Sequence, residues 1–464
     1  VILTADGVGE WATTTVAVGR KNDLEIKKEI HFPHSLGLLY SAFTYYTGFK
    51  VNSGEYKLMG LAPYGKPKYV NLIKNKLIDI KDDGSFHLNM EYFDYATGLK
   101  MTNKKFENLF DGPARKPHEK LSQKHMDLAS SIQKVTEEVV IKLVRNIALQ
   151  TGEKNLCLAG GVALNCVANG ILQKEKIFEK IWIQPAAGDA GGSLGAALIA
   201  HYLYGNKERK VNSDEIDAMR GSYLGPEYSS SEIEKDLNIA GAKYKKVSDE
   251  EIINFSANEL SKGKIIGWMH GRCEFGPRAL GNRSILADPR DPEMQKNLNL
   301  KIKYRESFRP FAPSILEEKA NIWFESDQKN PYMLFVSLLN EDKKLDVSNE
   351  EENFKGLRKL ELGRSVVPSV THVDFSARVQ TVSKSTNKKF YDLISKFEEK
   401  TNCPILINTS FNVRGEPIVC SPYDAFACFM STEIDILIIE NYILKKEDQV
   451  LLDRNKYLSK FPLD

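Results

Sequence analysis

The sequence lacks the signatures of several protein classes. Its six cysteines form no Cys-x-x-Cys pair and have no histidine at zinc-ligand spacing. No apolar run is long enough to cross a bilayer, and no signal-peptide pattern opens the chain. We therefore expect reduced thiols, a cytoplasmic location and no membrane partner.

Net charge is also nearly absent. The 64 Lys and Arg residues are balanced by 62 Asp and Glu residues, which leaves a formal charge of +2. Bulk electrostatics therefore do not favour a nucleic-acid partner. A hydrophobic content of 42% over 464 residues is typical of a globular protein with two or three domains.

Basic residues do concentrate locally. Positions 264–309 hold ten Lys or Arg against five Asp or Glu. Within this stretch, GRCEFGPRALGNRSILADPR at 271–290 sets four arginines among three glycines: Arg272, Arg278, Arg283 and Arg290. A second cluster follows in KIKYRESFRPFAPS: Lys301, Lys303, Arg305 and Arg309. Because the planar guanidinium group binds carboxylate and phosphate oxygens in pairs, this stretch predicts a site for a small phosphorylated ligand.

The alternative for such a stretch is a solvated basic face, which is the usual explanation of a charge run. Apolar residues are interleaved with the arginines and would draw the stretch against a core: Phe275, Ile285, Leu286, Phe308 and Phe311. This interleaving favours the ligand site over a plain surface.

Two strand–glycine–helix units occur earlier in the chain. A strand at 155–159 leads into Gly160, Gly161 and Asn165, and a strand at 180–184 leads through Gly188 and Asp189 toward a helix at 196–204. Glycines between a strand and a helix let a nucleotide approach the backbone closely. The carboxylate of Asp189 could hold a metal ion beside the phosphates.

The first residues predict a three-strand meander at 1–6, 13–18 and 24–30. Asp6 and Gly7 follow its first strand. Two interpretations of this Asp-Gly pair stay open. It presents backbone N–H groups to phosphates, or it forms an ordinary hairpin turn. Apolar residues at helical spacing predict helices at 36–46 and 121–148, where packing is the expected role.

A second α/β domain is predicted from residue 221. Its expected helices span 229–239, 249–262, 390–400 and 421–431, and its expected strands span 264–269, 404–407 and 434–439. Asn408 and Ser410 are expected in a polar elbow after the 404–407 strand. Functional groups would again lie at strand ends.

Eight motifs, in order, resemble those of the O-carbamoyltransferases of the nodulation-factor, cephamycin and tobramycin type. The resemblance runs over essentially the whole chain. The motifs are DGVGEWATT at 6–14, GEYKLMGLAPYG at 54–65, GGVALNCVANG at 160–170, PAAGDAGGSLGAA at 185–197, EFGPRALGNRSILADPR at 274–290, RESFRPFAPS at 305–314, THVDFSARVQTV at 371–382 and NTSFNVRGEPIV at 408–419.

The resemblance implies an actin/hexokinase-like (ASKHA, RNase H-like) ATPase domain over 1–220 and a YrdC-like carbamoyltransferase domain over 221–464. It implies that carbamoyl phosphate and ATP form a carbamoyl-adenylate, whose carbamoyl group passes to the hydroxyl of a sugar, an antibiotic or another small molecule. A divalent metal (iron, magnesium or manganese) and a homodimer are expected with it.

The resemblance also implies roles for single residues. Asp189 matches the metal-ligating aspartate, and the nucleotide side takes Asp6, Gly7, Gly160, Gly161, Asn165 and Gly188. The catalytic set is expected to be Arg278, Asn282, Arg283 and Arg305. Phosphate contacts are expected from Arg272, Lys301, Arg309, Asn408 and Ser410.

One departure from the family pattern concerns the start of the chain. The family's metal-binding histidines lie upstream of the DGVGEWATT motif, and only five residues precede it here. We therefore expect that the first half of the N-terminal domain is missing from this chain. Two alternatives stay open, a carbamoyl-adenylate enzyme of tRNA modification and a truncated, non-catalytic nucleotide-binding protein.

Overall fold

The computed structural model describes residues 1–209, 217–326, 328–346, 354–450, 457 and 459–461. The chain divides into two compact units. Unit 1 comprises Val1–Asn212 with Phe354–Lys359, and unit 2 comprises Ser213–Asn353 with Leu360–Asp464. This division lies a few residues before the boundary predicted at 220/221. Both units are mixed α/β structures built on one large sheet each.

Unit 1 contains a five-stranded sheet in the order β3-β2-β1-β6-β7. The strands are β1 (Ile2–Ala5), β2 (Ala12–Arg20), β3 (Asp23–His31), β6 (Asn155–Ala159) and β7 (Lys180–Ile183). The predicted meander is confirmed, because β1, β2 and β3 pair antiparallel. Strands β6 and β7 extend the sheet in parallel from β1.

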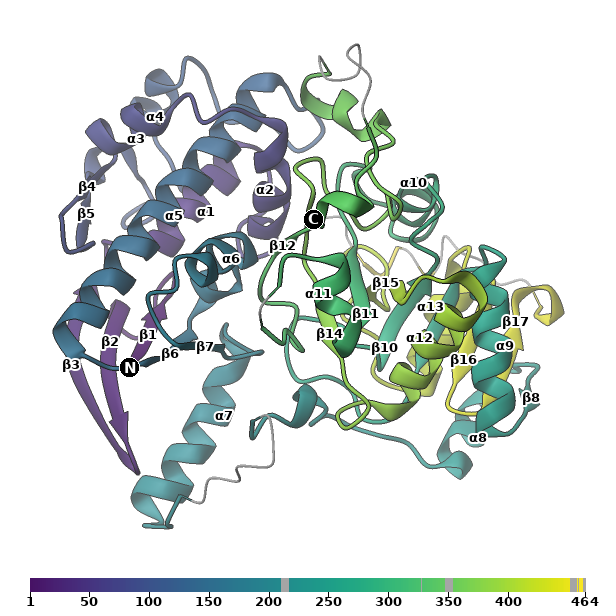
Figure 1. The fold of residues 1–464 in the computed structure, drawn as a ribbon. Coiled ribbons are helices and arrows are strands. Elements are labelled where there is room, and N and C mark those ends of the chain that lie inside the picture. The colour runs from purple at the N-terminus through teal and green to yellow at the C-terminus, as the bar shows by residue number, and fades with distance from the viewer. Residues whose placement is uncertain (210–216, 327, 347–353, 451–456, 458, 462–464) are drawn as a thin grey trace. The chain divides into compact units, whose positions relative to one another are not determined.

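Helices pack together beside this sheet. They are α1 (Leu36–Tyr46), α2 (Glu55–Leu61), α3 (Val70–Lys76), α4 (Lys104–Leu109), α5 (Gln123–Thr151) and α6 (Cys166–Lys174), and a hairpin of β4 (Ile78–Ile80) and β5 (Phe86–Leu88) lies among them. The long helix α5 contacts α1, α2, α3 and α6, so it is the central helix of this layer (Figure 1). Its predicted apolar stripe is buried, as Leu128, Ile132, Val135 and Val139 are all fully covered.

Helix α7 (Ala190–Ile199) begins six residues earlier than predicted. We expected Gly191, Gly192 and Gly195 in a loop, but they lie within the helix. No proline interrupts this stretch, so the helix continues from Ala190 through its glycines. A Cβ on Gly191 would lie 2.1 Å from the carbonyl oxygen of Ala186, so a glycine is needed there.

Unit 2 contains an eight-stranded sheet in the order β14-β11-β15-β10-β9-β16-β17-β8. The strands are β8 (Lys245–Lys246), β9 (Ile266–Met269), β10 (Arg283–Ala287), β11 (Ala312–Leu316), β14 (Gln380–Val382), β15 (Ile405–Ser410), β16 (Ile436–Ile439) and β17 (Tyr442–Lys445). A separate pair is formed by β12 (Ser337–Leu338) and β13 (Ser376–Ala377). Strands β9, β10, β11 and β16 are buried along their whole length, so the sheet is the centre of the unit.

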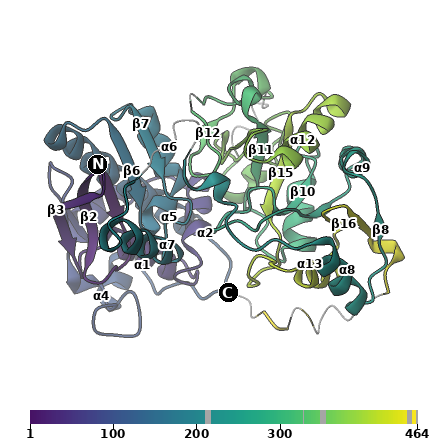
Figure 2. The ribbon, with the colours of Figure 1, turned by 90° about the horizontal axis from the view of Figure 1, so that it is seen from below.

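Helices cover both faces of this sheet. They are α8 (Ser230–Ile239), α9 (Asp249–Ser261), α10 (Met294–Asn297), α11 (Ala320–Trp323), α12 (Lys388–Thr401) and α13 (Pro422–Ser431). Helix α9 packs on α12 and helix α8 packs on α13. Figure 2 shows these two pairs on opposite sides of the sheet.

Two features of unit 2 differ from the sequence prediction. Strand β10 lies within the arginine-rich stretch and β11 directly follows it. No strand was predicted at either place, because charged neighbours hid the short apolar runs SILA and APSIL. Asn408, Thr409 and Ser410 are the last residues of β15 and do not form an elbow after it. Pairing with β10 continues through Ser410, which explains the extension.

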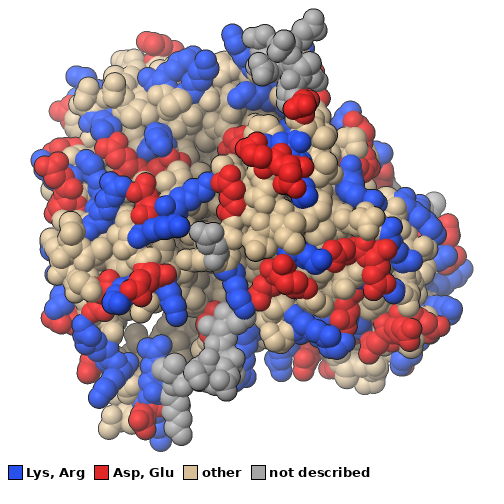
Figure 3. Space-filling model, viewed as in Figure 1, with Lys and Arg blue, Asp and Glu red and all other residues tan. Residues whose placement is uncertain are grey.

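No helix among the described residues is long and apolar enough to cross a membrane. On the face seen in Figure 3, basic and acidic side chains are interspersed, as the balanced composition predicts.

Candidate functional site

Three of the predicted nucleotide loops meet at one edge of the unit 1 sheet. Strands β1, β6 and β7 run parallel, so their carboxyl ends lie at the same edge. Asp6–Gly7 follows β1, Gly160–Gly161 follows β6, and Gly188–Asp189 follows the end of β7. Ligands of open α/β sheets bind at such an edge. The topology therefore gathers residues that are more than 150 positions apart in the sequence.

Asp6 joins two of these loops. Its Oδ1 accepts hydrogen bonds from the backbone N–H groups of Gly7 at 2.7 Å and Gly161 at 3.2 Å. Gly160 has a φ of 87°, and a Cβ there would lie 2.2 Å from the carbonyl oxygen of Ala5. Close contact between the β1 and β6 loops thus depends on glycine at 160.

Asn165 supports this edge from within the protein. Its Oδ1 accepts the backbone N–H of Ala168 at 3.1 Å and caps α6. Its amide also exchanges hydrogen bonds with Gln133 of α5, at 3.0 and 3.2 Å. These contacts use much of the hydrogen-bonding capacity of Asn165 and fix the start of α6.

The predicted metal ligand Asp189 is exposed and stands at the N-cap of α7 without a side-chain capping bond. Among the described residues, no group of three or more His, Cys, Asp and Glu side chains could hold a metal ion. One exposed carboxylate is a poor site for a divalent metal, which needs several ligands. The described residues therefore do not fit a resident metal centre, and we derive no chemical step through one.

The second set of predicted residues gathers at one edge of the unit 2 sheet. Strands β9, β15 and β16 end at this edge. Strands β10 and β11 run antiparallel to β15 and therefore begin at this edge, and β14 begins there because it is parallel to β11. This edge carries Ser410 at the end of β15, Arg283 at the start of β10, and the segment 303–311 that leads into β11.

Lys303 is the central cation of this edge. Its side chain is buried, with 2% of the residue exposed. Its ammonium group donates to the carbonyl oxygens of Ser410 and Asn412, the latter at 2.9 Å, and to Asn412 Oδ1 at 2.8 Å. Ser410 Oγ lies at 3.3 Å from it and donates to Asn412 Oδ1 at 2.7 Å. Lys303 therefore ties the segment before β11 to the turn after β15.

Burial lowers the pKa of Lys303 well below its ordinary value, and the neighbouring charges of Arg305 and Arg309 lower this pKa further. The oxygen shell opposes this shift because it binds the charged form. Burial and the neighbouring cations thus disfavour the positive charge of Lys303, while its oxygen shell favours it.

Further arginines surround an acidic side chain beside Lys303. The Glu306 carboxylate lies 4.0 Å from Arg309 and 3.8 Å from Arg414, which is too long for hydrogen bonds. The guanidinium of Arg305 lies over the ring of Phe311, 4.8 Å from its centroid, and donates to Asn299 Oδ1 at 2.6 Å. Arg309 and Arg414 thus lie near the carboxylate of Glu306, and a second acidic residue, Glu416, lies near Lys303. The arginines and Lys303 would suit a polyanionic ligand.

Two of the predicted residues are buried structural groups in this arrangement. Arg283 is fully buried, and its guanidinium donates to backbone carbonyl oxygens, among them those of His270 at 3.0 Å and Gly271 at 3.1 Å. The catalytic role predicted for Arg283 has no support in this geometry, because these donors hold loops in place. Asn408 is likewise buried and donates to Ala279 and to side chains within the core.

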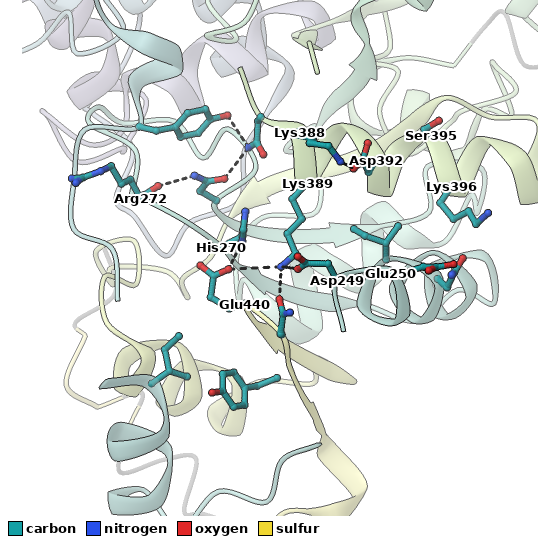
Figure 4. A pocket seen from close by; sticks show the side chains of 18 of the residues that line it. Asp249, Glu250, His270, Arg272, Lys388, Lys389, Asp392, Ser395, Lys396 and Glu440 are labelled. Carbon is teal, nitrogen blue, oxygen red and sulfur yellow. Dashed lines mark hydrogen bonds and ion pairs between the residues drawn. The ribbon is translucent and has the colours of Figure 1, made fainter. Parts of the chain in front are cut away.

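Arg272 and Asn282 line a cavity of about 1060 Å³ in unit 2. Asn282 Nδ2 donates to the carbonyl oxygen of Arg272 at 2.8 Å, and the exposed Arg272 side chain donates to Gly225 at 3.1 Å. Charged side chains inside the cavity pair with one another (Figure 4). Lys389 lies 2.9 Å from Asp249 and 3.8 Å from Glu440, and Glu440 lies 2.5 Å from His270.

The sequence analysis named Lys303 only as a member of the second basic cluster, and it did not predict Asn412 and Arg414 as site residues. Lys301 was predicted to contact phosphate, but it is exposed, and Lys303 is the lysine that reaches Ser410. Asn412 and Arg414 belong to the same cluster. No local pattern indicated Asn412 and Arg414, because they lie in the bend and turn at 411–415 that follow β15.

Comparison with known proteins identifies the family of this chain. The model of the carbamoyltransferase N-terminus matches residues 1–198, and the model of the carbamoyltransferase C-terminus matches residues 257–446. The chain belongs to the carbamoyltransferase family. The N-terminal domain that we expected to be partly missing is recognised from residue 1 onward.

Relatives of the chain extend over both units. An uncharacterized protein of Synechocystis is 57% identical over 466 residues, which cover 100% of this chain and 75% of the relative. The nodulation protein NolNO of Sinorhizobium fredii is 38% identical over 96% of this chain and 61% of its own length. The nodulation protein NolO of Bradyrhizobium diazoefficiens is 35% identical over 100% of this chain and 78% of its own length. The chain thus spans three-fifths to four-fifths of these carbamoyltransferase relatives.

Proposed function

We propose that this carbamoyltransferase hydrolyses carbamoyl phosphate to carbamate and inorganic phosphate, and joins the carbamate to the α-phosphate of ATP with release of pyrophosphate. The carbamoyl group of this carbamoyl-adenylate then passes to a hydroxyl of a sugar, an antibiotic or another small molecule, with AMP as the leaving group. The observation that carries this proposal is the cation cluster of Lys303, Arg305, Arg309 and Arg414 at the edge of the unit 2 sheet. Family membership supplies the reaction class.

The cluster suits the first step for an electrostatic reason. Carbamoyl phosphate and the pyrophosphate that leaves ATP are both polyanions, and preformed cations stabilise the charge that develops as pyrophosphate departs. Ser410 and Asn412 are held by Lys303 beside these cations, where hydroxyl and amide groups can orient a carbamoyl group. We therefore propose unit 2, as a YrdC-like domain, for adenylate formation.

For unit 1 we propose an actin-like nucleotide site at the edge of Asp6, Gly160 and Gly188. Backbone N–H groups of glycine loops bind phosphate oxygens well. Support comes from the convergence of the three loops at the ends of parallel strands. As partners we propose carbamoyl phosphate, the hydroxyl acceptor and a second copy of the chain.

Pyrophosphate release from ATP tests the proposal, with and without carbamoyl phosphate. We expect release that depends on carbamoyl phosphate, and its loss in Arg305→Ala. Arg220→Ala is a control that removes an arginine outside the cluster. Release that is independent of carbamoyl phosphate, or undiminished in Arg305→Ala, would contradict the proposed site.

A further inference from the structure

Arg278 lies on a loop that several buried polar groups hold in place. The loop runs from Glu274 to Asn282 and contains no helix or strand. On one side, Phe275 exchanges two hydrogen bonds with Ser222, a backbone N–H bond of 2.7 Å and a hydroxyl-to-carbonyl bond of 2.5 Å. On the other side, the carbonyl oxygen of Ala279 accepts from Asn408 at 3.2 Å. Arg278 therefore stands between two anchored residues.

The carbonyl oxygen of Leu280 is held twice. It accepts from the hydroxyl of Tyr223 and from Nε2 of Gln380, each at 2.8 Å. Gly281 follows with a φ of 107°, and a Cβ there would lie 2.2 Å from the ring of Phe390. The backbone path after Arg278 is thus fixed by contacts from three separate parts of unit 2.

Glu274 gathers the amide groups of this turn. Its Oε1 accepts the backbone N–H groups of Leu280 at 2.7 Å, Asn282 at 2.8 Å and Arg283 at 3.3 Å. Convergent N–H groups of this kind form an anion-binding nest, and here the anion belongs to the protein itself. Three donors on one oxygen fix the turn more firmly than a single bond would.

The environment of Glu274 shows that the fold retains this carboxylate at a cost. The residue is 8% exposed, and its Oε2 has no hydrogen-bond partner among the described residues. Burial raises the pKa of Glu274, while the backbone hydrogen bonds of Asn282, Leu280 and Glu274 itself and the charge of Arg283 oppose that rise. A buried carboxyl group with one unbonded oxygen destabilises a fold unless the hydrogen bonds of its other oxygen compensate.

We infer that Glu274 is a positioning residue, whose Oε1 shapes the 274–282 loop so that Arg278 is presented to the phosphate of carbamoyl phosphate. This inference rests on the proposed function. The bond from Asn408 to Ala279 supports it, because it places the loop over the end of β15, two residues before Ser410. Glu274 itself does not touch the ligand, since its free oxygen is shielded from solvent.

Three substitutions distinguish the effect of the length of the Glu274 side chain from the effect of its negative charge. Glu274→Gln keeps an oxygen at the same distance from the backbone and loses the charge. Glu274→Asp keeps the charge and withdraws the oxygen by one methylene group. Glu274→Ala loses both. We expect the KM for carbamoyl phosphate to rise about tenfold or more in the Ala and Asp variants and about threefold or less in the Gln variant, with smaller changes in kcat, because a small misplacement of a binding group is felt strongly.

A double-mutant cycle with Arg278→Ala then tests the route of the effect. If Glu274 acts through Arg278, Glu274→Ala adds about twofold or less to the KM in the Arg278→Ala background, since both changes remove one interaction. Additive effects, an unchanged KM in the Ala and Asp variants, or a Gln variant as impaired as the Asp variant would overturn the inference. Should Glu274→Ala fail to fold, the Gln and Asp variants decide the outcome alone.

Amide hydrogen exchange separates this inference from the proposed function. Segment 276–283 is expected to exchange faster in Glu274→Asp than in Glu274→Gln, whether or not the chain turns over carbamoyl phosphate. Equal exchange in the two variants would contradict the role of Oε1. A wild-type chain that does not bind carbamoyl phosphate would instead contradict the proposed function.

Discussion

Replacing Lys303 by Met tests the centre of the cation cluster. The substitution preserves length and apolar volume and removes the ammonium group from Ser410 and Asn412. The carbonyl oxygens of Ser410 and Asn412 then each lose a donor, and Asn412 Oδ1 loses one of its two donors, at about 1 kcal/mol for each lost bond. Relief of a buried charge offsets about 1 kcal/mol of that loss, so the expected net destabilisation is about 2 kcal/mol. For a unit of this size, this lowers Tm by roughly 4–8 °C.

Lys301→Met is a matched control two residues away. Lys301 is exposed, so we expect little change in Tm and carbamoyl-phosphate-dependent pyrophosphate release close to that of the wild type. Lys303→Met is expected to lose about a hundredfold in this release, because an ordered cation near developing negative charge is lost. The reasoning is refuted if Lys303→Met melts like the wild type, or if Lys301→Met has the larger effect on release.

The pH dependence of stability provides a second measurement on the same pair. The pKa of Lys303 is lowered by burial from its ordinary value of 10.5. Between the lowered value and 10.5, the unfolded chain binds more protons at this position than the folded chain, so wild-type stability rises with pH. We therefore expect the difference in free energy of unfolding between wild type and Lys303→Met to widen as pH rises through this window.

Three further predictions concern single contacts. Glu306→Gln removes a negative charge near Arg309 and Arg414, so it should tighten the binding of inorganic phosphate, measured by calorimetry, about fivefold. The exposed control Glu293→Gln should leave this binding unchanged. Weaker binding in Glu306→Gln would show that Glu306 orients the arginines. Gly160→Ala should destabilise unit 1 by about 3 kcal/mol, and the control Gly152→Ala by about 1 kcal/mol. Both glycines have positive φ, but only at Gly160 would the added Cβ lie 2.2 Å from a backbone oxygen. Equal Tm shifts in the two variants would contradict this. His125 completes the capping box of α5 with Ser122, and burial lowers its pKa from 6.5 to about 4, so the stability of the wild type should fall as pH drops from 6.5 to about 4. His125→Gln keeps the box without titrating and should show a shallower fall in stability in urea titrations. Parallel profiles of the two proteins would count against the assignment.

Regular elements with uniform apolar patterns were predictable from the sequence. The first meander, helix α1, the stripe of α5 and the strands β6, β9 and β16 have the residues that local periodicity predicts. Strands β10 and β11 were missed because arginines and prolines flank runs of only a few apolar residues. Their strand character depends on pairing with β15, which lies about 100 positions further along the chain and is invisible to local patterns.

The candidate site was predictable as a region and less so as a set of side chains. Composition alone located the arginine-rich stretch and the glycine loops. Which lysine or arginine turns inward depends on the path of the segment before β11, where Lys303 is buried and Lys301 is exposed. Arg283 illustrates the same limit, because its burial against the carbonyl oxygens of His270 and Gly271 follows from the tertiary structure and not from its motif.

The two proposed anion sites rely on different groups, and the topology of the two sheets explains the difference. In unit 1 three parallel strands end together, so the glycine loops after β1 and β6 bring backbone N–H groups to one edge, where Asp6 accepts two of them. In unit 2 the strands β10, β15 and β11 alternate in direction, so the edge receives both beginnings and ends of strands. Fewer strand-to-helix turns then converge, and Lys303 with its neighbouring arginines supplies the positive potential instead. Glu274 occupies the amide nest that this edge does form, and we propose that side-chain cations such as Arg278 face the phosphate instead.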